Sequence, residues 1–301
     1  MTLVTANRRV AGYDQFMAAH ISTVNSSRLR TMVIPREHGA WGMMLVPLAT
    51  GAIVALRSGV NAGTLALFVV AAMSLFWLRT PVEAWLGTSA IKAQGQPERA
   101  FVLRAISAIA GLGMLCIATL LWNGRNRGLL LIGGVAAVAF AWQAVVKKLG
   151  RKSRMPAQII GALGLTSTAA GAYYVATGKL DTTAIALWLA NWLFAGNQIH
   201  YVQVRIRSSR AVTMDEKLGQ GSTFLGGQIV VIGALLAACR VGFFPAPVAL
   251  AFVPVLFRGT LWFVRGRQPL DVHKLGYSEL TQALIFGALL CAAFSGLTVS
   301  S

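Results

Sequence analysis

Residues 102–122 read VLRAISAIAGLGMLCIATLLW and residues 128–147 read GLLLIGGVAAVAFAWQAVVK, with only NGRNR between them. A helix needs about 20 predominantly apolar residues to cross the hydrocarbon core of a bilayer. Both runs have that length, so each predicts a membrane-spanning helix. Glycine pairs within such runs, as in Gly133/Gly134 here and Gly161/Gly164 further on, predict close approach between helices.

Seven further runs of this kind occupy 40–57, 63–85, 156–177, 181–203, 222–239, 245–263 and 280–299. The chain of 301 residues is 56% hydrophobic and only 12% charged, whereas soluble domains carry about 25% charged residues. The sequence therefore predicts an all-α polytopic integral membrane protein with about nine transmembrane helices. Residues 1–31 are polar and hold no apolar core of signal-peptide length. We expect a disordered basic N-terminal tail over 1–31 and a single transmembrane helical domain over 32–301.

The net charge of +18 comes mainly from basic residues in the loops and at the ends of the predicted spans. With nine spans, one side receives the amino-terminal tail and the loops 86–101, 148–155, 204–221 and 264–279. That side holds all of the 27 Lys and Arg residues except Arg57, Arg125, Arg127, Lys179 and Arg240. The asymmetry predicts a cytoplasmic N-terminus, an external C-terminus and a multi-pass plasma-membrane protein whose basic loops face anionic lipid. Nucleic acid is not an expected partner, because zinc spacings and basic heptads are missing from the sequence.

Polar residues gather at the cytoplasmic ends of the predicted spans. They are Arg36, Glu37, His38, Arg79, Glu83, Asn191, Asn197, Gln198, His200, Tyr201, Arg205, Arg207, Arg258, His273 and Glu279. Charged groups in spans are costly and usually face a cavity or a partner. One interpretation is a polar cavity open to the cytoplasm and lined by the first, second, sixth, eighth and ninth spans. The alternative is interfacial snorkelling with ion pairs between helices.

The spacing of polar residues within the helices favours the interpretation as a cavity over interfacial snorkelling. Asn197, Tyr201 and Arg205 form an i, i+4, i+8 stripe, and Asn191 does not lie on it. Arg258 is too far inside its span to snorkel. Histidine spacings of a metal site are missing, and so are acidic clusters that would hold Mg²⁺. The three cysteines lie within apolar runs. We therefore expect no metal site and no cofactor.

The phrase IPREHGAWGMMLVPLATG at 34–51 resembles the opening motif of the YwiC-like family, a group of bacterial membrane proteins of unsettled function. The resemblance continues in RTPVEAW at 79–85 and YVQVRIR at 201–207. It implies a bacterial inner-membrane protein.

A second resemblance is to the UbiA-type intramembrane prenyltransferase superfamily. It is carried by MPAQIIGALGLTSTAAGAYYVATG at 155–178, LANWLFAGNQIHYVQVR at 189–205 and DEKLGQGSTFLGG at 215–227. It implies a UbiA-like helical bundle with nine helices and a cytoplasmic amino terminus. In that superfamily two aspartate-rich motifs hold Mg²⁺ against an isoprenoid diphosphate.

The aspartate motifs are largely replaced here. Glu83 stands for one aspartate of the first motif, while Gln198, Arg205 and Arg207 occupy aspartate positions of the second. Guanidinium groups repel Mg²⁺ but bind phosphate or carboxylate through paired N–H donors. The resemblance therefore implies a site for an isoprenoid phosphate or other anionic lipid without the usual Mg²⁺ chemistry, and it leaves open whether the protein is an enzyme.

Three functions remain open from the sequence. The first is a lipid-binding bundle that holds an isoprenoid or other anionic lipid and could modify it, with proton transfer by Glu37, His38 or Glu83. Its ligand-binding residues would be Arg36, Arg79, Asn197, His200, Tyr201, Arg205, Arg207 and Arg258, with Trp41, Trp77, Trp85 and Trp192 as candidates for an apolar channel. The second is a small-anion transporter. The third is a non-catalytic membrane assembly partner, whose loop VKKLGRKSRMP at 146–156 would bind lipid headgroups.

Overall fold

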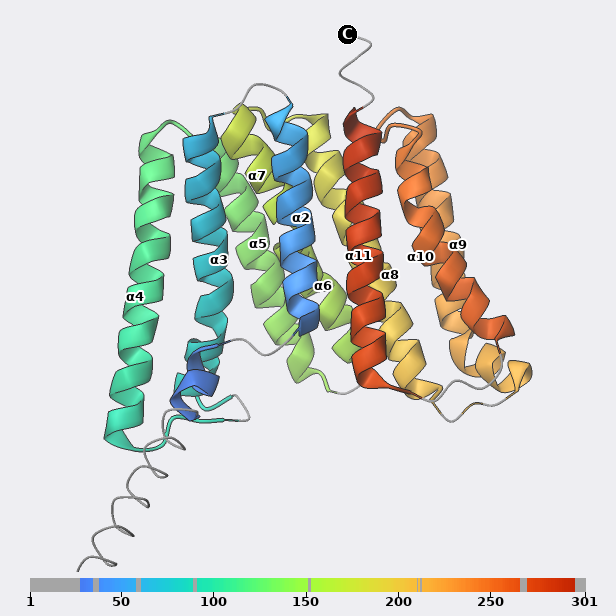
Figure 1. Cartoon of the computed structure of the whole chain (residues 1–301), viewed down its shortest axis with the longest axis horizontal. Coiled ribbons are helices and arrows are strands. Elements are labelled where there is room, and N and C mark those ends of the chain that lie inside the picture. The colour runs from blue at the N-terminus through green and yellow to red at the C-terminus, as the bar shows by residue number, and fades with distance from the viewer. Residues whose placement is uncertain are drawn as a thin grey trace, which may run out of the picture. The chain divides into compact units, whose positions relative to one another are not determined.

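The computed structural model describes residues 28–34, 38–57, 61–88, 91–150, 153–209, 211, 213–265 and 270–295. These residues form helices and their connections, with no strand among them, which confirms the all-α class. The labelled helices (Figure 1) are α2 (His38–Leu56), α3 (Ala62–Trp85), α4 (Gly95–Trp122), α5 (Asn126–Lys148), α6 (Arg154–Thr166), α7 (Thr168–Thr177), α8 (Thr182–Arg207), α9 (Met214–Arg240), α10 (Val248–Val264) and α11 (Val272–Ser295).

The apolar runs predicted from the sequence coincide with these helices, except that the run 156–177 is divided between α6 and α7. Two shorter apolar helices are Trp41–Leu56 and Val248–Val264. Segments both long and apolar enough to cross a membrane are Ala62–Trp85, Gly95–Trp122, Arg127–Lys148, Arg154–Thr177, Met214–Arg240 and Val272–Ser295. The chain is therefore a polytopic integral membrane protein, and the total of nine spans stays a prediction.

The chain divides into two compact units. The first unit comprises residues 1–36 and 70–118. Its core contains Met32, Ala84, Ala93 and Val102. The indole of Trp77 donates a hydrogen bond of 2.7 Å to the carbonyl of Val33. These contacts tie the short segment before α2 to the end of α3 and the start of α4.

The last residues of the predicted N-terminal tail belong to the first unit. Residues 1–27 lie outside the described residues, and 28–33 are helical. Arg28 forms an ion pair of 3.0 Å with Glu98 of α4. The predicted division into a tail and one transmembrane domain stays a prediction.

The second unit comprises residues 37–69 and 119–301. Its central element is α8, which packs against α2, α6, α7, α9 and α10 (Figure 1). Around it, α2 also packs against α7 and α11, and α10 packs against α9 and α11. α8 is 26 residues long, yet it is not among the strongly apolar segments because it carries the polar stripe. Its central position lets these polar residues face protein instead of lipid.

Small residues let helix backbones approach within this unit. A Cβ atom at Gly51 of α2 would lie 2.1 Å from the carbonyl oxygen of Ala169 in α7, so only glycine fits there. Gly161 and Gly164 of α6 lie directly against side chains of α5. Gly133 and Gly134, in contrast, have no neighbouring atom within 4 Å of an added Cβ. The prediction of close packing is therefore confirmed for Gly161/Gly164 and wrong for Gly133/Gly134, whose faces are open.

The run that the sequence presented as one span is interrupted at Ser167. The hydroxyls of Thr166, Ser167 and Thr168 each donate to a main-chain carbonyl three or four residues earlier. Such bonds compete with the helical pattern and bend a helix. Three consecutive hydroxyls therefore mark the boundary between α6 and α7.

Candidate functional site

The larger cavity of the second unit is enclosed by α2, α6, α8 and α11 and has a volume of about 230 Å³. Its wall on α8 extends from Asn191 to Ile206, and its wall on α11 extends from Val272 to Ala283. Most of the lining is apolar. We call this space the larger cavity.

A proline helps to shape the α2 wall of the larger cavity. Pro47 lies inside α2 and has no N–H to donate to the carbonyl of Met43, one turn earlier. Both residues line the cavity. The wall therefore includes a position at which the usual helical hydrogen bond cannot form.

Asn191 is a deeply buried polar residue that lines the larger cavity, at 1% exposure. Its Nδ2 donates to the carbonyl of Leu187 at 2.8 Å and to the hydroxyl of Thr50 at 3.1 Å. Its Oδ1 has no hydrogen-bond partner among the described residues. The amide therefore joins α8 to α2 and leaves one acceptor unsatisfied.

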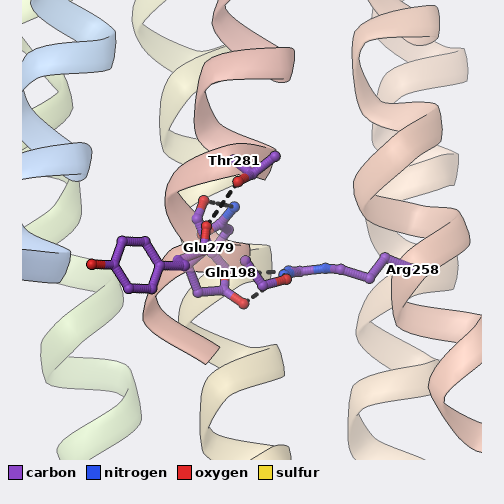
Figure 2. Close-up of polar contacts among 6 residues, drawn as sticks. Gln198, Arg258, Glu279 and Thr281 are labelled. Atoms are coloured by element: carbon purple, nitrogen blue, oxygen red, sulfur yellow. Dashed lines mark hydrogen bonds and ion pairs between the residues drawn. The ribbon is translucent and has the colours of Figure 1, made fainter. Parts of the chain in front are cut away.

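A largely buried ion pair, of which Glu279 lines the larger cavity, joins α10 to α11 (Figure 2). Arg258 of α10 donates through Nη1 and Nη2 to the two carboxylate oxygens of Glu279 in α11, at 2.6 and 3.2 Å. The two side chains are 14% and 13% exposed. Nη1 also donates to the hydroxyl of Ser278 at 3.2 Å. Gln198 of α8 donates to the main-chain oxygen of Glu279 at 3.4 Å, so three helices meet at this pair.

The same guanidinium group stacks on an aromatic ring. Its Cζ lies 4.2 Å from the ring centroid of Tyr201, a distance at which a cation is attracted by the ring face. Beyond it, Arg205 Cζ lies 5.6 Å and Lys217 Nζ 5.3 Å from the ring centroid of Trp262. Arg205, Lys217 and Arg258 therefore form a cationic group around two aromatic rings of α8 and α10.

Lys217 has a structural task within this group. It is 2% exposed, and its Nζ donates to the main-chain oxygens of Trp262 and Arg265, at the C-terminal end of α10. A cation at this end of a helix satisfies the last carbonyls and complements the helix dipole.

Several buried donors in this cationic group have no hydrogen-bond partner among the described residues. They are Arg205 Nε, Arg258 Nε and Trp262 Nε1. All are donors and none can accept a hydrogen bond. A group that satisfied these donors would be negatively charged and rich in hydrogen-bond acceptors.

A second space, which we call the smaller cavity, lies between α6, α8 and α9 and has a volume of about 170 Å³. It is lined by apolar and aromatic side chains and by Asn197 and His200. The ring of His200 meets Phe224 edge-on, at a centroid distance of 5.3 Å. Asn197 donates to Gln228 of α9 at 3.1 Å.

The predicted stripe of α8 lies on one face of the helix, but that face packs on α9 and α10. Asn197 bonds Gln228, Tyr201 lies beside Phe224 and Arg258, and Arg205 lies over Trp262. The structure therefore brings Tyr201, Arg205 and Arg258 together. His200 lines the smaller cavity and Arg207 is exposed.

The structure describes the predicted residues at the first two spans only in part. Arg79 and Glu83 belong to the first unit, where they form an exposed ion pair of 2.8 Å on α3. Arg36 and Glu37 lie outside the described residues, and of His38 only the main chain is described. Of the tryptophans, Trp85 is exposed, while Trp192 lines the smaller cavity.

Three residues of the predicted polar set that were not among the predicted ligand-binding residues line the larger cavity: Asn191, Gln198 and Glu279. The sequence did contain a signal for two of them. Asn191 and Gln198 are seven residues apart, which places them on one face of a helix, two turns apart. For Glu279 the sequence offered its position at the start of the last predicted span, but its partner lies on another helix. No three His, Cys, Asp or Glu side chains of the described residues gather as a metal site would require.

Comparison with known families agrees with the first resemblance. Residues 34–173 match the family model described as YwiC-like protein. The matched region begins just before α2 and ends inside α7. No curated protein matches the chain. The likeness to the UbiA-type superfamily stays a prediction.

Proposed function

Starting from a YwiC-like region in a polytopic membrane protein, we propose that this chain binds an isoprenoid or other anionic lipid in the second unit. The observation that carries the proposal is an apolar cavity whose lining residue Glu279 is paired with Arg258, a member of a cationic group that has unsatisfied donors. An amphipathic anion would satisfy both.

The larger cavity suits the lipid tail. Its wall on α8 runs over 15 residue steps, from Asn191 to Ile206, which at 1.5 Å per residue is about 22 Å. Ligand sites of this kind are mainly apolar, with a few polar groups that fix orientation. An extended isoprenoid or acyl chain matches such a shape.

The cationic group around Tyr201 and Trp262 suits the headgroup. Arg258 is connected to the cavity through its partner Glu279, which lines it. Glu279 is the carboxylate that balances Arg258, while Arg205 and Lys217 add further positive charge. A phosphate or carboxylate would accept from Arg205 Nε and compete with Glu279 for the fork of Arg258.

The proposal includes an orientation. The positive charge of the loops favours a cytoplasmic N-terminus and a cytoplasmic α8–α9 connection, in a plasma membrane that carries anionic lipid. A cysteine introduced at Thr213, in that connection, should then resist a membrane-impermeant maleimide in intact cells. A cysteine at Lys179, in the α7–α8 connection, should react. The opposite pattern would reverse the orientation.

Native mass spectrometry of the purified protein tests the ligand. Arg205→Gln removes a headgroup donor and Ala283→Leu fills the cavity wall, where Ala283 is 6% exposed. Arg240→Gln and Ala292→Leu change an exposed cation and an exposed alanine and serve as matched controls.

We expect the wild type and both controls to retain an anionic lipid and the two site variants to lose it. Retention that is equal in all five proteins would contradict the proposal. So would a wild-type protein that carries no anionic lipid.

A further inference from the structure

The larger cavity has one exposed end and one buried end. Ile206, near the C-terminal end of α8, and Val272, at the start of α11, line it and are exposed. Val46 of α2, Asn191 of α8 and Ala283 of α11 line it and are buried. Because α8 ends on the side at which α2 and α11 begin (Figure 1), the three buried residues lie at the same end. We call the exposed end the mouth and the buried end the floor.

Contacts just beyond the floor close it. Gly287 of α11, one turn past Ala283, lies against α2, where an added Cβ would lie 3.0 Å from Cγ1 of Val46. The rings of Phe194 in α8 and Phe286 in α11 are stacked, at a centroid distance of 4.0 Å. α11 therefore packs directly on α2 and on α8 at this point, and a chain that enters from the mouth has no space beyond it.

The polar side chains at the floor are turned to the protein. The hydroxyl of Thr166, which lines the cavity, donates to the carbonyl of Ala162 at 2.8 Å. Asn191 Nδ2 donates to Leu187 and Thr50, and its Oδ1, although without a partner among the described residues, is itself buried. The floor can therefore receive the end of an apolar chain.

Gln198 and Glu279 line the cavity between the floor and the mouth, and Glu279 holds Arg258. Under the proposed function, on which this inference rests, the anionic headgroup binds at this level. Gln198 follows Asn191 by seven residues of α8, so at 1.5 Å per residue the floor lies about 10 Å away. Single bonds of about 1.5 Å advance an extended chain by about 1.3 Å each, so about eight bonds span that distance.

The volume of the larger cavity sets a similar limit. Benzene fits an apolar cavity of about 150 Å³, which corresponds to about 25 Å³ per carbon atom. The volume of about 230 Å³ therefore holds about nine carbon atoms. A chain as long as the whole α8 wall, about 22 Å, would need about twice that volume. Length and volume thus agree on a short chain.

We propose that the larger cavity selects its ligand by chain length, and that the ligand is a single-chain amphiphile with an anionic headgroup and about eight to ten carbons in its chain. Val46 and Ala283 set the limit, because they are the floor residues of α2 and α11 whose size decides how deep the chain reaches. A phospholipid with two long chains exceeds the space.

Native mass spectrometry of the protein in phosphatidylcholine nanodiscs tests the selection. The nanodiscs carry equal amounts of hexyl, octyl, decyl, dodecyl, tetradecyl and hexadecyl phosphate and of the corresponding alcohols. The enrichment of each compound is its share among the bound ligands divided by its share in the nanodisc. We expect the greatest enrichment for octyl or decyl phosphate. Hexadecyl phosphate, whose chain must bend or pull the headgroup away from Gln198, should be enriched about tenfold less or lower still.

The floor offers two variants with opposite effects. Val46→Ala removes two carbons from the floor, so the preferred chain should lengthen by about two carbons. Ala283→Val adds two carbons, so the preferred chain should shorten by about two carbons. Val253→Ala and Ala292→Val make the same changes at exposed positions of α10 and α11 and should leave the preference unchanged.

Two outcomes would overturn the inference alone. One is an enrichment of the phosphates that is level or still rising up to the hexadecyl chain. The other is an identical preference in the wild type and both floor variants. Should neither floor variant fold, the wild-type series decides. The proposed function fails in a different way: no phosphate of any length would then be enriched over the alcohol of the same length, and this inference would fall with it.

Discussion

Arg258 of α10 and Glu279 of α11 are joined by two hydrogen bonds between one guanidinium and one carboxylate, with both side chains about six-sevenths buried. The fork of arginine matches the two oxygens of a carboxylate, so the pair fixes the relative position of the two helices as well as neutralising its own charge. Each group depends on the other, because either one alone would be a buried charge without a counterion.

Glu279→Leu should therefore destabilise the protein by about 3–5 kcal/mol, since it leaves Arg258 uncompensated. The double replacement Arg258→Met with Glu279→Leu should recover most of this loss, because apolar residues of similar volume often substitute for a buried pair at little cost. Denaturant unfolding in mixed micelles measures both. A double variant as unstable as the single one would show that the pair is not the source of the effect.

Gly51→Ala should destabilise the contact between α2 and α7 by about 1–3 kcal/mol or more. The added Cβ would meet main-chain atoms of Ala169, which cannot move aside as a flexible side chain can. Gly133→Ala is the matched control, because its Cβ would enter open space. It should be neutral or stabilising by up to about 1 kcal/mol through helix propensity. Equal melting temperatures for the two variants would contradict the contact.

Asp271 should make the start of α11 sensitive to acid. The backbone amide of Lys274 is the main cause of the lowered pKa of this carboxyl, and the amide of His273 adds to it, with N–H donors at 3.1 and 3.0 Å. A lowered pKa means that the ionised carboxylate stabilises the fold. The stabilisation is complete above the pKa of the unfolded chain and is lost as pH falls through the lowered pKa.

Amide hydrogen exchange in the first turn of α11 measures this effect. In the wild type, protection of that turn should fall under acid. Asp271→Asn keeps an acceptor at the same place but does not titrate, so its protection should not follow the same pH profile. Identical profiles for the two proteins would remove Asp271 as the cause.

Thr50→Val should cost about 0.5–1.5 kcal/mol, because Asn191 Nδ2 loses one of its two acceptors inside the protein. Thr260→Val is a suitable comparison, since the hydroxyl of Thr260 is exposed and bonds only carbonyls of its own helix. That change should stay within about 0.5 kcal/mol. Unfolding midpoints for the two variants test whether the link between α2 and α8 is stabilising.

The fold could largely be predicted from the sequence, because a bilayer restricts the length and the polarity of the segments that cross it. Apolar runs of about 20 residues must be helical there, and the runs coincide with the helices observed. The interruption at Ser167 was not predicted, because it depends on hydroxyls that bond carbonyls in their own helix and does not alter the hydropathy. Which glycines lie against a neighbour was equally hidden, as Gly133 and Gly161 show.

The candidate site was readable only in part. Periodicity placed Asn197, Tyr201 and Arg205 on one face of α8, but periodicity cannot tell which neighbour a face meets. Their partners Gln228, Arg258 and Trp262 come from two other helices. Arg258 was recognisable as a costly group inside a span and Glu279 as a polar group at the start of one. Their pairing across 21 residues required the tertiary structure.

Two indoles of α8 hold α6 in a fixed register. Trp188 donates to the carbonyl of Leu163 and Trp192 to that of Ile159, both at 2.9 Å, so donors four apart meet acceptors four apart. Sliding one helix along the other by a residue or two would break both bonds at once. A shift of one full turn, about 5.4 Å, would offer each indole the next carbonyl in the row. The two bonds therefore oppose any displacement of α6 along α8 that is smaller than one full turn.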